Sequence, residues 1–530
     1  MSARAYLLLA VLGCGVSLAV AHFQQFPGYL DSDYYFGGGL QLAAGKGFTE
    51  PYIWNYLDDP LSLPHPSHTY WMPLASMVTA AGLWITGQDS YWAGRIGFII
   101  LASLVPVVTA ALAFSFSRRS DLAALSGLLA VFSGYYAPFL PVTDNYAPYM
   151  FLGGLFFLVL SSNRKFVPLA LGILSGLMTL ARSDGMLWLG LTLLVVLRRR
   201  DRQFAARPGQ SGRPPIAARI TALLTGSAAL QVILAGAGFL LVTGAWFWRT
   251  EALFGSFLAP GGARLLWLHN YNETFLYPGN QLTIRHWLEQ GWMAIVQARL
   301  SALKWNLLNA FAAQGDLVLV PFILLGLWTH RQDQRVRAGC LAWLVLLFVM
   351  TVVFPFAGAR GGFFHSGAAL QSLWWAAAPL GLETAITAAR ARNLFTVHAF
   401  LIFRTALVGV AVLMTAAIVT LRVVRGWGEG EQYYAAQEAV LRQSAARPGE
   451  VVMVRNPPGF FIMTGQPAIV VPYGDSSSML AAASRYDANY VIIEAAGAVG
   501  PIKTVYDDVR STTFQFLGEV NGARIFRISR

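Results

Sequence analysis

The stretch IGFIILASLVPVVTAALAFSF, residues 96–116, decides the fold class of this chain. It holds no charged residue and is as long as the roughly 20 residues that an α-helix needs to cross a bilayer. Arg118 and Arg119 follow it directly, as basic residues do at the cytoplasmic end of a membrane helix. The stretch therefore predicts a transmembrane helix, which we place at residues 91–116.

The composition extends this interpretation to most of the chain. The 530 residues are 56% hydrophobic and only 12% charged, whereas soluble globular chains carry about 25% charged residues. A single buried core does not explain this deficit, because large soluble proteins must cover themselves with polar surface. The formal net charge is +12, but the basic residues lie between apolar runs, so we expect membrane lipids and not nucleic acid as partners. Cys14 and Cys340 lie far apart in apolar runs and predict neither a disulfide framework nor a metal site.

Eleven apolar segments are predicted to be transmembrane helices. The first can be read as a signal peptide, but it is long, has no clear cleavage site and is followed by many spans, so we keep it as a helix. The predicted spans are residues 6–22, 91–116, 122–139, 146–161, 166–180, 185–197, 220–246, 317–328, 338–356, 368–386 and 400–423.

The basic residues orient these helices. They gather in alternate loops, and the positive-inside rule places such loops in the cytoplasm. We therefore expect a multi-pass plasma-membrane protein with a cytoplasmic N-terminus and an external C-terminus. The five basic loops contain Arg118 and Arg119; Arg164 and Lys165; Arg198, Arg199, Arg200, Arg202, Arg207, Arg213 and Arg219; Arg331, Arg335 and Arg337; and Arg390 and Arg392.

Two long loops and the C-terminal segment are predicted to lie outside the membrane. Residues 1–424 form the transmembrane domain, with large outer loops at 23–90 and 248–316. Within the first loop, residues 70–86 are apolar but short, and a span there would invert every later basic loop, so we expect them to lie along the outer membrane surface. Residues 425–530 turn polar and predict a soluble α/β domain. Its strands are expected at 451–454, 469–471, 490–493 and 524–528.

The first candidate for chemistry is the acidic segment Gly28-Tyr-Leu-Asp-Ser-Asp-Tyr-Tyr35, just outside the first predicted helix. A carboxylate where the chain leaves the bilayer can act as general base on an acceptor hydroxyl or amine. The structural alternative is an acidic turn among the tyrosines of the membrane boundary.

The order of such segments resembles the GT-C superfamily of membrane glycosyltransferases, which includes the protein O-mannosyltransferases and the bacterial aminoarabinose transferases. In that superfamily the first helix leads to a long outer loop that opens with an acidic motif and an aromatic residue, as Asp31-Ser-Asp-Tyr-Tyr35 does here. Further similar segments follow in the family's order, and the resemblance covers roughly residues 6–423. These segments are a helix and glycine turn at 40–48, a proline-containing segment at 70–74, the approach to the second span at 87–95 and a turn at 172–185.

The resemblance implies a glycosyltransferase that moves a hexosyl or pentosyl group from a polyprenyl-phosphate carrier to a lipid, glycan or protein acceptor. It implies Asp31 as the catalytic base. Because Ser32 stands where the family has its second acid, Asp33 takes that role if the register differs by two residues. Asp144 matches a second outer acid of the family, and its alternative is the N-cap of the following helix. No cofactor is firmly predicted, and a divalent cation remains open.

A departing phosphate needs cations at the outer face, and the sequence offers three arginines there. Arg182 lies in a tight turn, where it can instead pair with Asp184. Arg360 precedes two glycines, whose backbone N–H groups can approach a phosphate, and His365 follows five residues later. Arg95 is the third, although it can simply extend toward the membrane surface.

The main alternative is a transporter or flippase of a lipid-linked sugar. Such proteins place ionisable groups near the middle of the membrane and often show two related halves. The predicted spans here hold few charges, and we find no internal repeat. A membrane scaffold that presents the C-terminal domain is a weaker hypothesis, because eleven helices exceed what an anchor needs.

Overall fold

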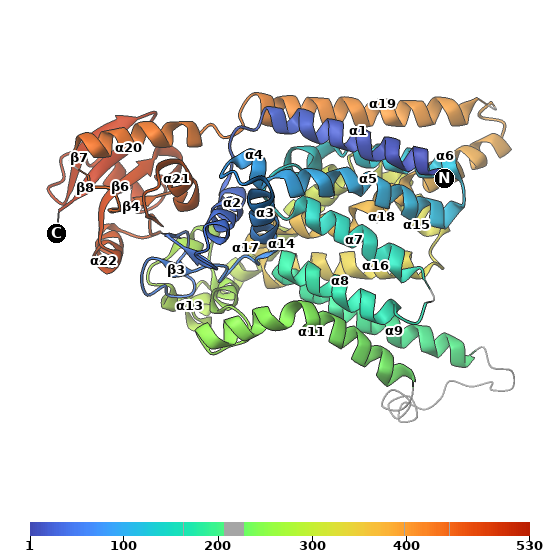
Figure 1. Ribbon diagram of the computed structural model, residues 1–530, viewed down its shortest axis with the longest axis horizontal. Coiled ribbons are helices and arrows are strands. Elements are labelled where there is room, and N and C mark those ends of the chain that lie inside the picture. Colours follow the sequence, from blue (N-terminus) through green and yellow to red (C-terminus); the bar gives the residue numbers. More distant parts are fainter. Residues whose placement is uncertain (163, 206–226, 397, 445, 530) are drawn as a thin grey trace.

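The computed structural model describes residues 1–162, 164–205, 227–396, 398–444 and 446–529. It is a bundle of long helices with a layer of sheet and short helices at one end (Figure 1). Figure 1 places this C-terminal layer at the left-hand end of the bundle and the N-terminus at the right-hand end. Three of the predicted cytoplasmic arginines, Arg207, Arg213 and Arg219, and the start of the predicted span at Ile220 lie outside the described residues.

Each predicted transmembrane segment that the structure describes lies on a helix. The bundle helices are α1 (Ala3–His22), α5 (Ile96–Ser117), α6 (Ser120–Val131), α7 (Tyr146–Leu160), α8 (Val167–Ala181), α9 (Met186–Ala205), α11 (Ser227–Phe254), α15 (Val320–Thr329), α16 (Gln334–Phe348), α18 (Phe363–Ala391) and α19 (Ala399–Val419).

The number of eleven spans is not confirmed. Among the described residues, five helices are long and apolar enough to cross a membrane, namely Ala3–His22, Tyr91–Ser117, Ala229–Phe254, Gln334–Val353 and Ala399–Val424. Several other apolar helices have only 10–17 residues. One difference is local: within the span predicted at 122–139 the α-helix ends at Val131, Phe132 leaves the helical conformation with a ψ of 72°, and the chain continues as the 3-10 helix Gly134–Phe139.

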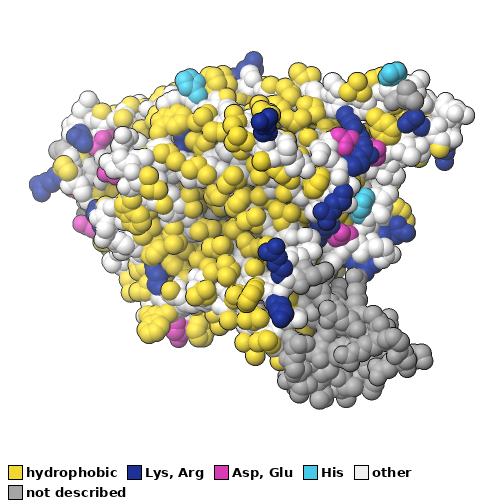
Figure 2. All heavy atoms as spheres, turned by 45° about the vertical axis from the view of Figure 1, so that its right-hand side comes forward, with side chains coloured by type: hydrophobic (Ala, Val, Ile, Leu, Met, Phe, Trp, Pro, Cys, Tyr) yellow, Lys and Arg dark blue, Asp and Glu magenta, His cyan; other side chains and the backbone are white. Residues whose placement is uncertain are grey.

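The outside of the bundle is apolar, as a membrane protein requires. Figure 2 shows hydrophobic side chains over most of one face, with most Lys and Arg side chains toward its right-hand side. Large hydrophobic side chains such as Leu240 (58% exposed) and Leu413 (70% exposed) point outward from α11 and α19. Such exposure is costly in water and is satisfied by lipid, so the chain is a multi-pass membrane protein.

The bundle packs around α18, whose residues from Gly367 to Leu382 are buried. Small residues let its neighbours approach closely. A methyl group on Gly153 of α7 would collide with the carbonyl oxygen of Ala369, and one on Gly326 of α15 would collide with that of Ala377. Close contact between small residues is the usual way in which helices associate within a bilayer.

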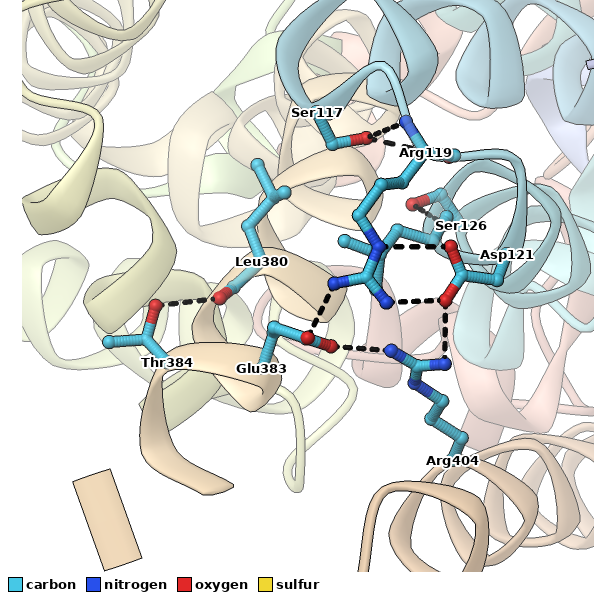
Figure 3. Close-up of polar contacts among 9 residues, drawn as sticks. Ser117, Arg119, Asp121, Ser126, Leu380, Glu383, Thr384 and Arg404 are labelled. Carbon is cyan, nitrogen blue, oxygen red and sulfur yellow. Dashed lines mark hydrogen bonds and ion pairs between the residues drawn. The ribbon is translucent and has the colours of Figure 1, made fainter. Parts of the chain in front are cut away.

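At the end of the bundle away from the C-terminal layer, four charged side chains form a closed network (Figure 3). Arg119 contacts Asp121 at 2.6 Å and Glu383 at 2.5 Å, and Arg404 contacts Asp121 at 2.8 Å and also pairs with Glu383. The network joins the turn before α6 to α18 and α19. Because the side chains are partly exposed, each pair adds little stability, and the network mainly fixes how these helix ends lie.

At the opposite end, α2 (Leu30–Ala43) and α3 (Leu74–Thr86) cross the bundle at a steep angle (Figure 1). The expectation that the segment 70–86 lies along the outer membrane surface stays a prediction. The antiparallel strands β1 (Thr49–Glu50) and β3 (His65–Pro66) lie between α2 and α3 in the chain. The second outer loop contains α12 (Pro260–Arg264), α13 (Ile284–Glu289) and α14 (Trp292–Asn309).

The C-terminal layer is built on a six-stranded sheet of order β2-β5-β4-β6-β8-β7. The four expected strands are confirmed as β4 (Val451–Val454), β5 (Ala468–Val470), β6 (Ala488–Glu494) and β8 (Ala523–Ile528). Two further strands were not predicted: β7 (Phe514–Val520), which carries a glycine and a register shift, and β2 (Tyr52–Ile53). The helices α20 (Tyr434–Gln443), α21 (Pro457–Thr464), α22 (Ser476–Tyr486) and α23 (Ile502–Asp507) accompany the sheet.

The edge strand β2 belongs to the first outer loop and pairs in parallel with β5. Two tyrosine hydroxyls add to this junction: Tyr56 donates to the carbonyl oxygen of Val470 at 2.5 Å, and Tyr486 donates to that of Pro60 at 2.8 Å. The sheet of the C-terminal layer is thus shared with the loop that carries the acidic segment.

Candidate functional site

Helix α2 points its two aspartates in opposite directions. It begins at Leu30, after Tyr29 in an extended conformation, and both acids lie in its first turn, where carboxylates favour the positive end of the helix dipole. Residues two apart on an α-helix are separated by roughly 200° around the axis. Asp31 and Asp33 therefore cannot serve the same site, although they stand almost side by side in the sequence.

Asp31 faces two groups from distant parts of the chain. One ligand atom each from Asp31, Asp144 and His365 lie within 4.8 Å of one another. The Nε2 atom of His365 is 3.7 Å from the Oδ2 atom of Asp31, whose side chain keeps 28% of its area exposed. His365 lies in the first turn of α18 and stacks on the ring of Tyr146, with 4.1 Å between ring centroids. The stacking fixes the imidazole beside the carboxylate.

Asp144 is completely buried, and three hydrogen bonds organise its surroundings. Tyr29 donates its hydroxyl to Oδ2 at 2.6 Å, and the backbone N–H of Asn145 donates to Oδ1 at 2.5 Å. The Asn145 side chain in turn donates to the hydroxyl of Tyr35 at 2.5 Å. The alternative role of Asp144 as a helix cap is not what the structure has, because Asn145 occupies the N-cap of α7.

Two of the three predicted arginines lie around this cluster. Arg182 follows α8 and contacts Asp184, with 2.8 Å between Nε and Oδ1, so the pairing foreseen in the sequence forms. Its charge also lowers the pKa values of both Asp31 and Asp144, which places it within electrostatic reach of them. Arg360 lies over the ring of Tyr271 at 4.6 Å.

Tyr271 links Arg360 to the carboxylates. Burial and then the charge of Asp31 raise the pKa of the Tyr271 hydroxyl, whereas the charge of Arg360 lowers it. Tyr271 comes from the second outer loop, in the 3-10 helix Tyr271–Phe275. The site is thus assembled from the two loops predicted to be external, the turn after α8 and the N-terminal ends of α7 and α18.

The two carboxyl groups of the site hold protons unusually well. Burial raises the pKa of Asp31, the neighbouring Asp144 raises it further, and Arg182 opposes both effects. Burial also raises the pKa of Asp144, but the Tyr29 hydroxyl, the Asn145 N–H and Arg182 restrain the shift. Asp31 is therefore a stronger proton acceptor than an exposed aspartate, which suits a general base that works near neutral pH.

Asp33 faces away from this cluster and is completely buried against the C-terminal layer. Its Oδ2 atom accepts a hydrogen bond from Asn456 Nδ2 at 2.7 Å. Burial and the adjacent Glu431 raise the pKa of Asp33 well above its ordinary value. Glu431 itself accepts the backbone N–H of Gly28 at 2.7 Å. Asp33 therefore belongs to the junction between α2 and the C-terminal layer.

Arg95 does not join the cluster either. It is completely buried, its Nη1 atom donates to the carbonyl oxygen of Gln24 at 2.9 Å, and its guanidinium lies 3.6 Å from the ring of Trp92. In this position it neither extends to the membrane surface nor lies open to a lipid phosphate. Its role is to hold the start of α5 against the end of α1.

The first outer loop has a second ionisable cluster, at the strands β1 and β3. His65 lies 3.0 Å from Asp58 and 3.5 Å from Glu50, and all three side chains are buried. Burial alone would lower the pKa of His65, but hydrogen bonds and charge contacts with Asp58 and Glu50 raise it to about 9. His68, three residues after His65, bonds to Ser67 and Ser76 instead, so the two histidines do not form a metal pair.

Two groups of described side chains have the donor types for a divalent cation. One is Asp31, Asp144 and His365, where two carboxylates and an imidazole converge. The other lies in the second outer loop and consists of His269, Glu273 and His286. Among the described residues, a divalent cation thus has two candidate sites.

The tyrosines of the site were not predicted from the sequence. Tyr29, Tyr146 and Tyr271 orient Asp144, His365 and Arg360, respectively. Tyr29 stands in the quoted acidic segment, and its place two residues before Asp31 is the one signal that pointed to it. Tyr271 reaches Arg360 only because the second outer loop folds back toward the site, and no local sequence pattern predicts this fold.

Comparisons with known proteins address the fold. No protein-family model and no curated protein sequence matches this chain. ArnT from Cupriavidus metallidurans, solved with bound undecaprenyl phosphate, is 12% identical over 99% of this chain and 98% of that chain, with a TM-score of 0.59. Apo ArnT is 11% identical over 98% and 97%, with a TM-score of 0.56.

A third similar structure is the archaeal oligosaccharyltransferase AglB from Archaeoglobus fulgidus, in complex with an inhibitory peptide and a dolichol-phosphate. It is 11% identical over 92% of this chain and 69% of that chain, with a TM-score of 0.50. ArnT and AglB are both GT-C glycosyltransferases. The resemblance inferred from the order of sequence segments is confirmed at the level of the fold.

Proposed function

We propose that this membrane protein with a GT-C fold is a glycosyltransferase that moves a sugar from a polyprenyl-phosphate carrier to an acceptor at the outer face of the plasma membrane. The observation that carries the proposal is the assembly of two carboxylates, an imidazole and two arginines around Asp31 at one end of the bundle. The similar structures support the donor class, because ArnT was solved with undecaprenyl phosphate and AglB with a dolichol-phosphate.

The chemistry assigned to the site starts with Asp31. Its carboxylate takes the proton from an acceptor hydroxyl or amine, which then attacks the anomeric carbon of the sugar. The bond between that carbon and the phosphate oxygen breaks from the opposite side, and its electron pair leaves with the phosphate. The configuration at the anomeric carbon is inverted. The proton acquired by Asp31 returns to solvent after the product leaves.

The remaining residues stabilise charge or hold Asp31 in place. Arg182 and Arg360 supply positive charge to the departing phosphate. Asp144, close to Asp31, increases the proton affinity of the base through its negative charge. A divalent cation bound by Asp31, Asp144 and His365 would supply further positive charge at the same place.

Helix α5 supports an outer location for the site. Its 22 residues rise by about 1.5 Å each, roughly 33 Å in total, which matches the hydrocarbon thickness of a bilayer. Arg118 and Arg119 follow its C-terminal end, whereas Phe98 near its N-terminal end packs in one apolar cluster with Tyr34 and Tyr35 of α2. If the basic end is cytoplasmic, Asp31 faces the outside.

The test is a transfer assay in membranes that contain the protein, with a panel of radiolabelled polyprenyl-phosphate sugars. We expect one donor to lose its sugar to an acceptor, and we expect Asp31→Asn to slow this transfer by about 100-fold or more. Asp89→Asn, an exposed carboxylate in the same loop, is the matched control and should keep the wild-type rate. A flippase would instead move the labelled lipid between leaflets and leave the sugar–phosphate bond intact.

A further inference from the structure

The second outer loop brings together two histidines and a glutamate that the proposed reaction does not use. The Nε2 atom of His286 lies 3.1 Å from Oε2 of Glu273, and the Nδ1 atom of His269 lies 3.7 Å from Oε1. The two imidazole rings stack almost in parallel, with 3.8 Å between centroids and 10° between planes. Each ring places one nitrogen near the same carboxylate, and the stacked rings would have to turn out of parallel for both nitrogens to point at one ion.

The spacing of these atoms is that of ligands around a small ion. Zinc holds imidazole nitrogens and carboxylate oxygens at about 2.0–2.2 Å in a tetrahedral arrangement, which puts neighbouring ligand atoms roughly 3.3 Å apart. The two measured separations, 3.1 and 3.7 Å, bracket this value. All three donor atoms lie within 4.8 Å of one another.

Hydrogen bonds around the cluster prepare the donors for a cation. The Nε2 atom of His269 donates to the carbonyl oxygen of His286. In the neutral ring, Nδ1 is then unprotonated and turns its lone pair toward Glu273. Two acceptors that face each other repel unless a proton or a metal ion lies between them. Fixing one ring nitrogen by an outer hydrogen bond is the usual way in which proteins orient a metal-binding histidine.

Local structure holds each donor in place. Glu273 lies in the 3-10 helix Tyr271–Phe275, and its Oε2 atom accepts the backbone N–H of His269 at 2.7 Å. His286 lies in the first turn of α13, where the Thr283 hydroxyl accepts its backbone N–H at 3.2 Å. The glutamate side chain is 9% exposed and the two imidazoles 25% and 24% exposed. One side of the cluster is thus open to water, which allows entry of an ion and a water molecule as fourth ligand.

We propose that His269, Glu273 and His286 form a zinc site that clamps the 3-10 helix Tyr271–Phe275 to α13. Two imidazoles and a carboxylate suit zinc better than magnesium or calcium, which require a shell composed almost entirely of oxygen. The clamp acts on the segment that carries Tyr271, the tyrosine beneath Arg360. The proposal is independent of the proposed function, because it concerns metal content and the order of the loop.

The first experiment measures metal in the full-length protein, purified in detergent without chelator. We expect inductively coupled plasma mass spectrometry to find one zinc per chain. Dialysis against a chelator should remove it, and the chelator-treated protein should take up zinc again when zinc is added but should not bind added magnesium. Zinc should raise the melting temperature of the chelator-treated protein. Cobalt in its place should give the intense visible absorption of a tetrahedral site.

Variants locate the ion. His269→Ala and His286→Ala should lose the zinc and the zinc-dependent rise in melting temperature. His365→Ala, the matched control from the other group of possible metal ligands, should keep both. Zinc retained by the two loop variants and lost by His365→Ala would place the ion at Asp31 and overturn the proposal.

A measurement on the wild-type protein covers the case in which the loop variants do not fold. Carbethoxylation read by mass spectrometry should modify His269 and His286 in the chelator-treated protein and spare them when zinc is added. Exposed His22 should react equally in both states. Equal modification of the two loop histidines with and without zinc, or purified protein that takes up no zinc, contradicts the site.

Discussion

Arg182→Ala should change both the rate of transfer and its dependence on pH. The arginine is paired with Asp184 at 2.8 Å, and its charge lowers the pKa values of Asp31 and Asp144. Without it, both pKa values rise further, because one of the effects that oppose burial of the two carboxyl groups is removed. Since Asp31 must be ionised to act as base, the rising limb of the pH–rate profile moves to higher pH.

The size of the rate loss follows from the contact with phosphate. Truncation of one partner of a buried charge contact costs about 2–5 kcal/mol, which corresponds to a roughly 30- to 5,000-fold fall in kcat/KM at the pH optimum. The assay is sugar transfer from the radiolabelled donor, measured from acidic to alkaline pH in the same membranes. Arg182→Lys keeps the charge and should lie between the wild type and the alanine variant.

Arg264→Ala is the matched control for this experiment. Arg264 also pairs with an outer-loop aspartate, Asp59, at 2.5 Å, but it takes no part in the cluster around Asp31. Its loss should leave the pH–rate profile in place. An Arg182→Ala enzyme whose acidic limb stays unchanged, or moves to lower pH, would refute the electrostatic role assigned to Arg182.

Three further predictions concern stability and topology. Burial raises the pKa of Glu431 from an ordinary 4.5 to about 7, so its ionisation opposes folding, and the free energy of unfolding should fall as the pH rises between these values. Glu431→Gln should remove this fall, measured by urea unfolding. An unchanged dependence of the free energy of unfolding on pH contradicts the raised pKa of Glu431. The pKa of His65 is raised to about 9, so its contribution to stability is complete below about pH 6.5 and disappears as the pH rises through 9. His65→Gln should flatten the resulting fall in melting temperature at alkaline pH. A variant whose melting temperature falls with pH as steeply as that of the wild type would count against the stabilising role of the His65 cluster. A cysteine at Ser444, in a chain whose two native cysteines are replaced by serine, should react with an impermeant thiol reagent on intact cells; reaction only after lysis would mean that the C-terminal layer is cytoplasmic.

The sequence predicted the helices of the bundle well, because long apolar runs separated by basic loops are typical of membrane-spanning helices. It predicted the ends of helices less well, since these depend on single residues. The backbone leaves the helical conformation at Phe132 and ends α6 at Val131, inside an apolar run whose hydropathy predicts a longer helix. The strand β2 was missed for another reason: two residues of the first outer loop become a strand only because β5, more than 400 positions later, offers its edge.

The same distinction applies to the site. Asp31, Asp144, Arg182, Arg360 and His365 were found from motifs, and the fold brings them toward one another. The sequence left Asp31 and Asp33 as alternatives for one role, and only the helical conformation of α2 separates them. Arg95 was included because an arginine near a helix end looks available to lipid, whereas packing against Trp92 buries it. Sequence position identifies charged residues near a membrane boundary, but tertiary packing decides which of them meet.

The most direct test of the whole account compares Asp31→Asn with Asp33→Asn in sugar transfer. Both variants must first show the wild-type melting curve in detergent and bind the donor normally. Asparagine keeps the size of aspartate but accepts no proton near neutral pH, so Asp31→Asn should lower the rate by about 10²- to 10⁴-fold. Asp33→Asn should have a milder effect, because Asp33 faces Asn456 and Glu431 in the C-terminal layer. Transfer by Asp31→Asn at the wild-type rate would contradict the account.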